Sequence, residues 1–366
     1  MRAVVRRGRE LVVDTVADPV PAAGQVVVRT LCCGICGSDL HAVHGMEAMV
    51  DLGARSGEPP LIDASADIVF GHEFCAELLD HGPGTDRRLK PGTRVVSVPV
   101  MPGAAGIETL GYSNRFPGGF AEIMLLAEPL LLAVPDDLSD AQAAMTEPFA
   151  VGEHAVAQSD AGADTVQLVV GCGPVGLAVI AALKARGLGP VIAADFSPAR
   201  RRIAEAMGAD IVIDPRQENP HARWASFGVP VSRAERSVLA MSGHAGKRAI
   251  VFECVGVPGM IQSLVEAVPP ATQILVAGVC MQTDAIEPFL CINKAIEMKF
   301  VLGYTPDEFA ATLGRIARGQ IDVAPAITGT VGLDDVPAAF AALADPERHC
   351  KIIVRPSSPS VSPQGA

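Results

Sequence analysis

One glycine-rich turn constrains the fold of this chain more than any other feature. The turn, Gly171–Gly176, follows the continuous apolar run Thr165–Val170 and precedes a helical pattern over Gly176–Arg186. A continuous β-branched run is typical of a strand that is buried on both faces. Glycines at the first, third and sixth positions permit a tight turn, close approach of a ligand and close packing of helix on strand. The pattern predicts one strand–turn–helix unit of a parallel sheet.

Further strands and helices alternate along the chain after this turn. Buried-strand patterns recur at Pro190–Ala194, Ile211–Ile213, Ala249–Glu253 and Gln273–Ala277, with helical patterns such as Pro198–Met207 between them. Alternation of this kind predicts an α/β domain with a doubly wound parallel sheet.

An acidic residue, Asp195, ends the next strand, 19 residues after Gly176. This position predicts hydrogen bonds to the ribose hydroxyls of a bound dinucleotide, whose pyrophosphate would lie at the helix N-terminus. A 2′-phosphate would meet Asp195 as a like charge, so NAD is favoured over NADP. Arg200 and Arg201 lie just beyond and keep NADP open. The alternative is a structural glycine turn that binds nothing.

Composition excludes several classes of protein. The chain has 366 residues, too many for one ordinary core, and 49% of them are hydrophobic. The formal net charge of −12 disfavours a nucleic-acid or anionic-membrane surface, because both need a basic face. No apolar stretch reaches the length of a membrane span, and the N-terminus lacks a signal-peptide core, so we expect a cytoplasmic protein. Nine cysteines without paired spacing do not indicate disulfides.

Three short segments carry side chains that bind metals. Cys36, Ser38, Asp39 and His41 lie within six positions after a strand, His72-Glu73 follows a long connection, and Glu147 comes before Pro148. Zinc takes sulfur, imidazole nitrogen and carboxylate oxygen, and a catalytic zinc keeps one position open. These segments could form such a site only by converging in space. An alternative for Cys33 and Cys36 is a redox pair, because they form a C-x-x-C.

Together these strings resemble the zinc-containing medium-chain dehydrogenase/reductase superfamily, especially its polyol and threonine dehydrogenase branch. The similarity covers nearly the whole chain; its other marker is Pro117–Glu122. The resemblance implies a β-rich GroES-like catalytic domain over residues 1–150, a Rossmann NAD-binding domain over 151–295 and a return to the catalytic domain over 296–366.

The resemblance also implies roles for the metal-binding segments. Cys36 and His72 correspond to catalytic zinc ligands, Glu147 to a third ligand, and Glu73 to a direct ligand or a neighbouring carboxylate. Asp39 corresponds to the carboxylate that orients the histidine ligand, and Ser38 and His41 to the proton relay. The expected cofactor-binding residues are Gly171, Gly173, Pro174, Val175, Gly176, Asp195, Arg200, Val255 and Gly278.

Two segments depart from the family pattern. Many relatives carry a second, structural zinc on four cysteines, but no cysteine lies between Cys75 and Cys172 in this chain, so we expect one catalytic zinc per chain. The segment that replaces those cysteines, Pro99–Pro117, is rich in Gly, Ala and Pro. The connection through Met46–Asp67 is longer than usual, and we expect it to border the substrate site.

The resemblance predicts reversible oxidation of a secondary alcohol to a carbonyl, with hydride transfer to NAD. We expect a small alcohol or carbonyl substrate and a homodimer or homotetramer. The alternatives are a zinc-independent NADPH quinone or enoyl reductase on the same fold, a non-catalytic NAD-binding protein, and a redox sensor that uses Cys33 and Cys36.

Overall fold

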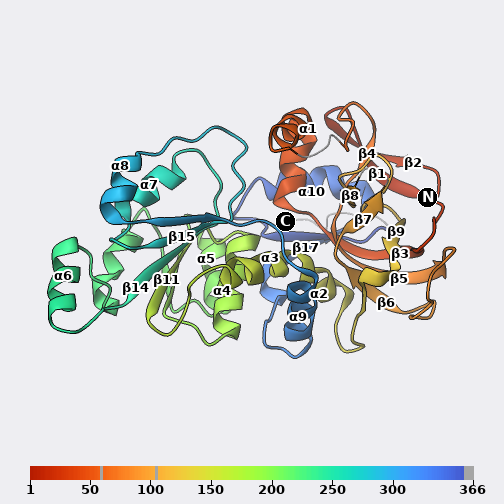
Figure 1. Ribbon diagram of the computed structural model, residues 1–366. Coiled ribbons are helices and arrows are strands. Elements are labelled where there is room, and N and C mark those ends of the chain that lie inside the picture. The colour runs from red at the N-terminus through yellow and green to blue at the C-terminus, as the bar shows by residue number, and fades with distance from the viewer. Residues whose placement is uncertain (58–60, 104–105, 358–366) are drawn as a thin grey trace. The chain divides into compact units, whose positions relative to one another are not determined.

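The computed structural model describes residues 1–57, 61–103 and 106–357, and the chain forms two compact units (Figure 1). The first unit comprises Met1–Glu147, Phe309–Ala317 and the residues from Ile327 onward, and the second comprises Pro148–Glu308 and Arg318–Ala326. The predicted tail Pro356–Ala366 falls largely outside the described residues. Among the residues described, no helix has the length and apolar character that crossing a bilayer requires.

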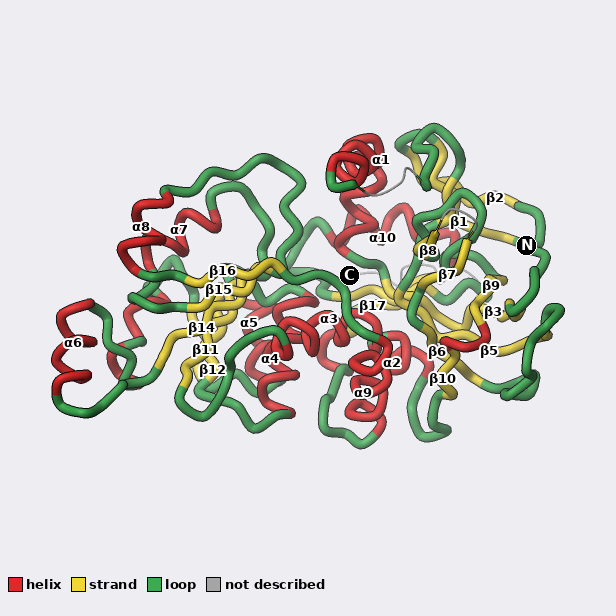
Figure 2. The backbone as a smooth tube through the Cα atoms, in the orientation of Figure 1, coloured by secondary structure: helices red, strands yellow, loops and turns green. Residues whose placement is uncertain are grey.

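The second unit contains the predicted parallel sheet. Six parallel strands lie in the order β13-β12-β11-β14-β15-β16, which is the doubly wound order (Figure 2). The strands are β11 (Thr165–Val170), β12 (Val191–Ala194), β13 (Ile211–Ile213), β14 (Arg248–Glu253), β15 (Gln273–Val276) and β16 (Glu297–Phe300). The helices are α3 (Thr146–Ala157), α4 (Pro174–Ala185), α5 (Pro198–Ala206), α6 (Arg233–Met241), α7 (Met260–Ala267) and α8 (Pro288–Lys294), with short 3₁₀ turns at Pro220–Arg223 and Ala225–Phe227. The α/β fold class is confirmed.

The parallel sheet extends beyond the domain boundary that we predicted at residue 296. Strand β16 pairs with β15 in register, and the chain joins the first unit only at Phe309. The sequence of β16, Glu-Met-Lys-Phe, gives no buried-strand signal because its side chains are largely exposed at the edge of the sheet.

The first unit is rich in strands, as predicted. Its main sheet has the order β10-β6-β5-β3-β18-β17, with β9 also paired to β3; a second sheet is β2-β1-β4, and β7 and β8 form a hairpin. The strands are β1 (Arg2–Arg7), β2 (Glu10–Thr15), β3 (Gln25–Gly34), β4 (Ile68–Val69), β5 (Glu73–His81), β6 (Arg94–Ser97), β7 (Val100–Gly103), β8 (Gly106–Thr109), β9 (Ile123–Ala127), β10 (Leu131–Ala133), β17 (Ile327–Val331) and β18 (Lys351–Val354). The helices are α1 (Gly37–Arg55), α2 (Asp140–Ala144), α9 (Pro306–Ala317, divided between the units) and α10 (Val336–Leu343), with 3₁₀ turns at Glu128–Leu130, Ala324–Ala326 and Leu333–Asp335.

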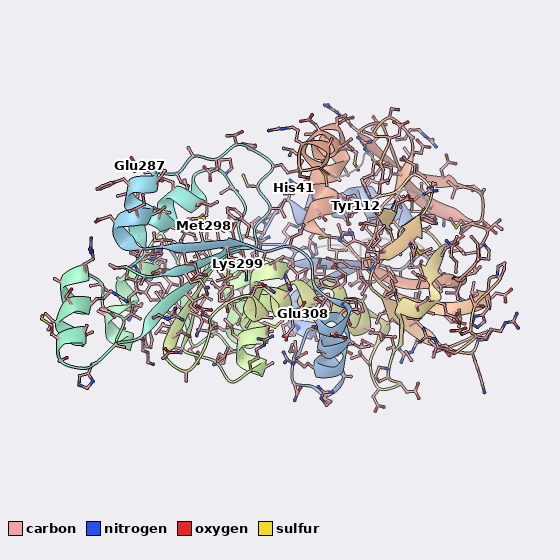
Figure 3. The ribbon with its side chains drawn as sticks, in the orientation of Figure 1. His41, Tyr112, Glu287, Met298, Lys299 and Glu308 are labelled. Carbon is pink, nitrogen blue, oxygen red and sulfur yellow. The ribbon has the colours of Figure 1, made fainter. Side chains whose placement is uncertain are left out.

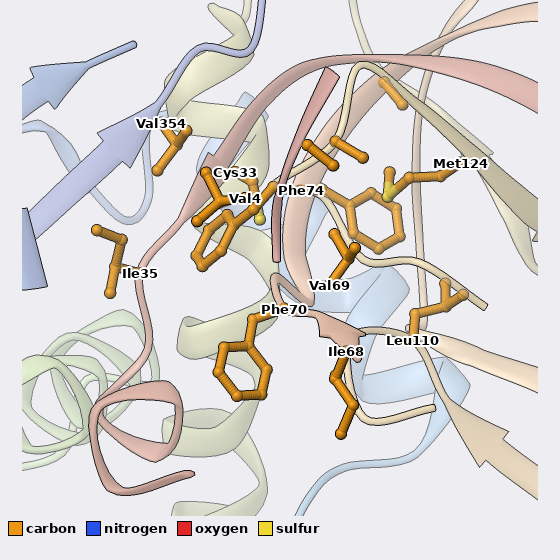
Figure 4. Packing of buried hydrophobic residues seen from close by; sticks show 14 of the residues in the cluster. Val4, Cys33, Ile35, Ile68, Val69, Phe70, Phe74, Leu110, Met124 and Val354 are labelled. Carbon is orange, nitrogen blue, oxygen red and sulfur yellow. The ribbon is translucent and has the colours of Figure 1, made fainter. Parts of the chain in front are cut away.

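Strand β3 is the central strand of this sheet, and it leads directly into α1. Cys32 and Cys33 on β3 are fully buried, and Cys33 packs in the apolar core with Phe70 and Phe74 (Figure 4). Burial raises the pKa of the Cys33 thiol well above its usual range. A buried, protonated thiol is inert, which argues against a redox pair of Cys33 with Cys36.

Helix α1 occupies part of the long connection that we expect to border the substrate site. The helix continues through Met46 to Arg55 with a kink at Gly45, and Met46 is fully buried. Residues 58–60 of the connection lie outside the described part of the chain. The buried Arg6 ties the connection to β1, because its guanidinium donates to the carbonyl oxygens of Val43 and Ala64.

Candidate metal centre and dinucleotide site

The start of α1 places two predicted site residues, Cys36 and Asp39, side by side. Cys36 is the N-cap residue of α1, and its backbone N–H donates to Asp39 Oδ2 at 3.0 Å. Asp39 is fully buried, whereas the Cys36 side chain is half-buried. The start of α1 therefore brings the Asp39 carboxylate and the Cys36 sulfur close to each other.

The pairing of β3 with β5 brings the second segment to this turn. Glu73, the first residue of β5, pairs with Gly34 of β3. Gly34 lies two residues before Cys36 in the sequence. A side chain at Gly34 would collide with the Glu73 carboxylate. Sulfur, nitrogen and oxygen ligand atoms of Cys36, His72 and Glu73 all lie within 4.8 Å of one another. This donor set suits zinc, and the fold brings residues 36 and 72 together in space.

The surroundings of His72 favour a cation. Its Nδ1 lies 3.5 Å from Asp39 Oδ1 and has no hydrogen-bond partner among the described residues. Burial lowers the pKa of His72, but Asp39 and the Cys36 sulfur raise the pKa more, so the net direction is well upward. Asp39 beside Nδ1 would orient the imidazole, so that Nε2 could bind a metal ion, as in carboxylate–histidine–metal sites.

Lys351, on strand β18, holds the Glu73 carboxylate. Its Nζ donates to both carboxylate oxygens of Glu73 at 2.7 Å and to the Ile35 carbonyl at 2.9 Å. Both side chains are 1% exposed. Burial lowers the pKa of Lys351, but Glu73 and Cys36 raise it more strongly, so the ammonium stays charged. The sequence analysis missed this residue, although a lysine at the start of an otherwise apolar strand indicates a buried charge that needs an acidic partner.

Glu147 is not one of the three residues in this group. It is in the first turn of α3 and is 9% exposed, but its carboxylate is not within 4.8 Å of all three other ligand atoms. The structure thus brings together three of the four predicted ligands. His41 lies on α1 with an exposed side chain (Figure 3).

A tyrosine that the sequence analysis did not single out contacts the predicted relay. The Oη of Tyr112 lies 2.9 Å from Ser38 Oγ and 2.9 Å from Asp39 Oδ1. Its ring centroid is 5.5 Å from that of His72. Burial, followed by the charges of Asp39 and Cys36, raises the pKa of Tyr112 well above its usual range, so the phenol is neutral.

The glycine turn of the second unit has the geometry that we predicted. Gly171 has φ +91°, and a Cβ on Gly176 would lie only 1.8 Å from the Gly171 carbonyl oxygen. Gly173 is the N-cap of α4, whose first two residues are Pro174 and Val175. The free N–H groups of this first turn point toward the glycine turn. Any larger residue at position 176 would push α4 away from β11 and open the turn.

The acidic residue of the predicted ribose site lies against this turn. The two carboxylate oxygens of Asp195 accept hydrogen bonds from Cys172 N and Ser197 N, each at 2.7 Å. The guanidinium of Arg200 approaches Gly173, whereas Arg201 donates to the Asp195 and Phe196 carbonyls and pairs with Asp214. Arg200 is therefore nearer to the glycine turn than Arg201.

The two remaining predicted cofactor residues lie at the ends of β14 and β15. Val255 N and Gly256 N both donate to Glu253 Oε1, at 2.7 and 2.9 Å. Gly278 lines a pocket of ≈ 220 Å³ together with Glu253 and Gly256. Ligands bind at the carboxyl ends of strands in such sheets. Glu253 was missed, although an acid that ends a buried strand is the same signal that identified Asp195.

Comparisons with protein families and curated relatives agree with this geometry. The family described as "Alcohol dehydrogenase GroES-like domain" matches residues 22–136, and the family described as "Zinc-binding dehydrogenase" matches residues 174–318. The (R,R)-butanediol dehydrogenase of Bacillus subtilis is 32% identical over 95% of this chain and 97% of that protein. Sorbitol dehydrogenase of the same organism is 26% identical over 97% of each chain.

A solved structure extends the comparison to three dimensions. The crystal structure of 2R,3R-butanediol dehydrogenase from Bacillus subtilis has a TM-score of 0.77 and 29% sequence identity to this chain. The match covers 97% of this chain and 99% of the solved chain. Both units are therefore present in full in this relative.

Proposed function

Because the chain belongs to the zinc-type medium-chain dehydrogenase superfamily, we propose that it oxidises a secondary alcohol or polyol reversibly to a carbonyl, with hydride transfer to NAD. The observation that carries this proposal is the group of Cys36, His72 and Glu73, with ligand atoms within 4.8 Å of one another. The named dehydrogenases among its relatives do not favour a zinc-independent reductase or a non-catalytic protein.

The residues of the first unit would act together on the alcohol. Cys36 and His72 would hold a zinc ion, with Glu147 as third ligand and Glu73 beside them. Zinc, when bound, supplies Lewis-acid chemistry that lowers the pKa of an alcohol. Ser38 accepts the hydroxyl proton, which passes to His41 and solvent, and Asp39 keeps His72 in the orientation for binding metal.

The second unit would bind and orient the nicotinamide cofactor. The N-terminus of α4 holds the pyrophosphate, and Asp195 accepts hydrogen bonds from the adenosine ribose. In support, Asp195 lies within hydrogen-bond distance of the glycine turn, and Arg201 is already engaged by Asp214 and backbone carbonyls. We therefore propose NAD as the preferred cofactor.

Purified protein tests the proposed function directly. We expect one zinc per chain by elemental mass spectrometry, and we expect diols, polyols or amino alcohols to give NADH absorbance at 340 nm. Removing zinc with a chelator should abolish turnover, and adding zinc should restore it. A protein that binds no zinc, or that turns over equally well without it, would contradict the proposal.

Replacing Asp195 with Asn should change the cofactor preference. The variant keeps an acceptor oxygen but loses the charge that binds the ribose and repels a 2′-phosphate. Hydrogen bonds to charged groups contribute about 1.5–3 kcal/mol, so kcat/KM for NAD should fall roughly 10- to 100-fold. The ratio of NADP to NAD turnover should rise. Asp210→Asn is the control, because Asp210 accepts from Lys184 and Val191 N at the start of β12. An unchanged ratio in Asp195→Asn would count against NAD selection by Asp195.

We also propose that a second copy of the chain covers the free edge of β16. Large apolar side chains are exposed there and on nearby α8: Phe300 is 68%, Leu302 85%, Phe289 74% and Ile292 77% exposed. An open sheet edge with apolar side chains is a template for pairing with another chain. Phe300→Glu with Leu302→Glu should convert an oligomer to a monomer in light scattering. A wild-type monomer would refute this assembly.

A further inference from the structure

The hydroxyl of Tyr112 connects two residues with different proposed roles. It lies at 2.9 Å from both Ser38 Oγ, in the proton relay, and Asp39 Oδ1, beside His72. Tyr112 belongs to the Pro99–Pro117 segment, which contains no cysteine, and its side chain is labelled in Figure 3. No role in the proposed reaction has so far been assigned to it.

The direction of these hydrogen bonds follows from the chemistry of the three groups. Asp39 is buried, and its carboxylate can only accept. Its Oδ2 takes the Cys36 N–H, and the Tyr112 hydroxyl is the donor within hydrogen-bond distance of Oδ1. A charged acceptor makes the stronger bond, so the single phenol proton points to Asp39. Tyr112 Oη then accepts from the Ser38 hydroxyl. As a lone pair of Ser38 Oγ accepts the substrate proton, Ser38 releases this hydroxyl proton toward His41 and solvent, so its oxygen stays neutral.

The segment that carries Tyr112 is anchored on both sides of it. A Cβ on Gly111 would lie 2.8 Å from Gly71 N, so the backbone before Tyr112 packs tightly against the residue that precedes His72. After it, Ser113 Oγ donates to the buried Glu108 at 2.6 Å, and Glu108 also pairs with Arg115. Asn114 donates to the Asp63 and Asp67 carbonyls. These contacts hold the phenol in place.

We propose that Tyr112 is a positioning residue that orients the Ser38 hydroxyl to accept the substrate proton and holds Asp39 against the ligands Cys36 and His72. This proposal rests on the proposed function and adds a residue to it. Tyr112 acts through its neighbours, so its loss should change two separate properties: the turnover number, through Ser38, and the zinc affinity, through Asp39.

Tyr112→Phe removes the hydroxyl and keeps the ring. Loss of a group that orients metal ligands weakens metal binding or activity by about 10- to 100-fold. We expect the dissociation constant for zinc, measured by competition with a chromophoric chelator, to rise about tenfold. At saturating zinc we expect kcat to fall about tenfold, with the KM for NAD unchanged. Tyr304→Phe, the same change at the other tyrosine of the chain, is the matched control for zinc affinity.

The same substitution in a Ser38→Ala background separates the two effects. There the Tyr112→Phe loss in kcat should disappear, because no serine hydroxyl remains to be oriented, while the loss of zinc affinity should persist. An undiminished kcat loss in this background would overturn the role through Ser38. Zinc affinity within twofold of wild type would overturn the role through Asp39. If the wild-type protein bound zinc and turned over as proposed, either result would leave the proposed function intact. A wild-type protein without zinc would overturn both proposals.

Discussion

Cys36→Ser should lose zinc and turnover while keeping its affinity for NADH. A serine hydroxyl is a poor zinc ligand, so we expect zinc content below a tenth of wild type, and Lewis-acid chemistry contributes several kcal/mol to the barrier. At about 1.4 kcal/mol per factor of ten, kcat/KM should fall roughly 10³-fold or more. The measurements are elemental analysis and the NADH absorbance assay with a substrate of the wild-type protein.

NADH binding distinguishes loss of the metal from loss of the fold. Trp224 is the only tryptophan in the chain, and it is buried in the second unit, apart from the metal-binding residues. Energy transfer from Trp224 to bound NADH should therefore be unchanged in Cys36→Ser. Cys291→Ser makes the same chemical change on α8 and should keep its zinc. Wild-type zinc content and turnover in Cys36→Ser would rule out Cys36 as a ligand.

Features that depend on neighbours in sequence were predictable. The glycine turn and Asp195 follow from spacing within one strand–helix–strand unit, and the structure places both as expected. The grouping of Cys36 with His72 could not be predicted from local spacing, because the register of β3 with β5 brings these positions together. Family resemblance supplied that step, since no local pattern contains it.

Features that depend on distant partners were not predictable. Lys351 is 278 residues from Glu73, and Tyr112 is 74 residues from Ser38. Neither has a motif, because the chemistry belongs to the pair and not to either residue. Strand β16 was missed for a different reason: its side chains are exposed, and periodicity detects strands only through burial.

The segment that carries Tyr112 is held by polar contacts between its own side chains. The chain has no cysteine between Cys75 and Cys172. Among the described residues of the segment, Ser113 and Arg115 both donate hydrogen bonds to the Glu108 carboxylate. A polar network therefore anchors this segment. Such a network leaves the site next to Ser38 dependent on hydrogen bonds.

The largest effect on stability should come from Lys351→Met. The variant leaves the Glu73 carboxylate buried without its ammonium partner, and removing one member of a buried pair costs about 3–5 kcal/mol. Unfolding by denaturant should show a loss of that size in the first unit. The measurement requires zinc-free protein, because a bound cation could compensate the charge of Glu73.

A double variant tests whether the loss comes from the unpaired charge. Glu73→Met combined with Lys351→Met replaces both ions with apolar side chains of similar length, and such replacements are often neutral or stabilising. The double variant should therefore recover most of the stability lost by Lys351→Met. Its zinc affinity should not recover, because Glu73 is one of the three side chains grouped at the metal centre. Equal stability of Lys351→Met and wild type would show that the pair does not support the fold. The contrast between recovered stability and lost zinc affinity separates the two roles of Glu73, as the partner of Lys351 and as a neighbour of the metal.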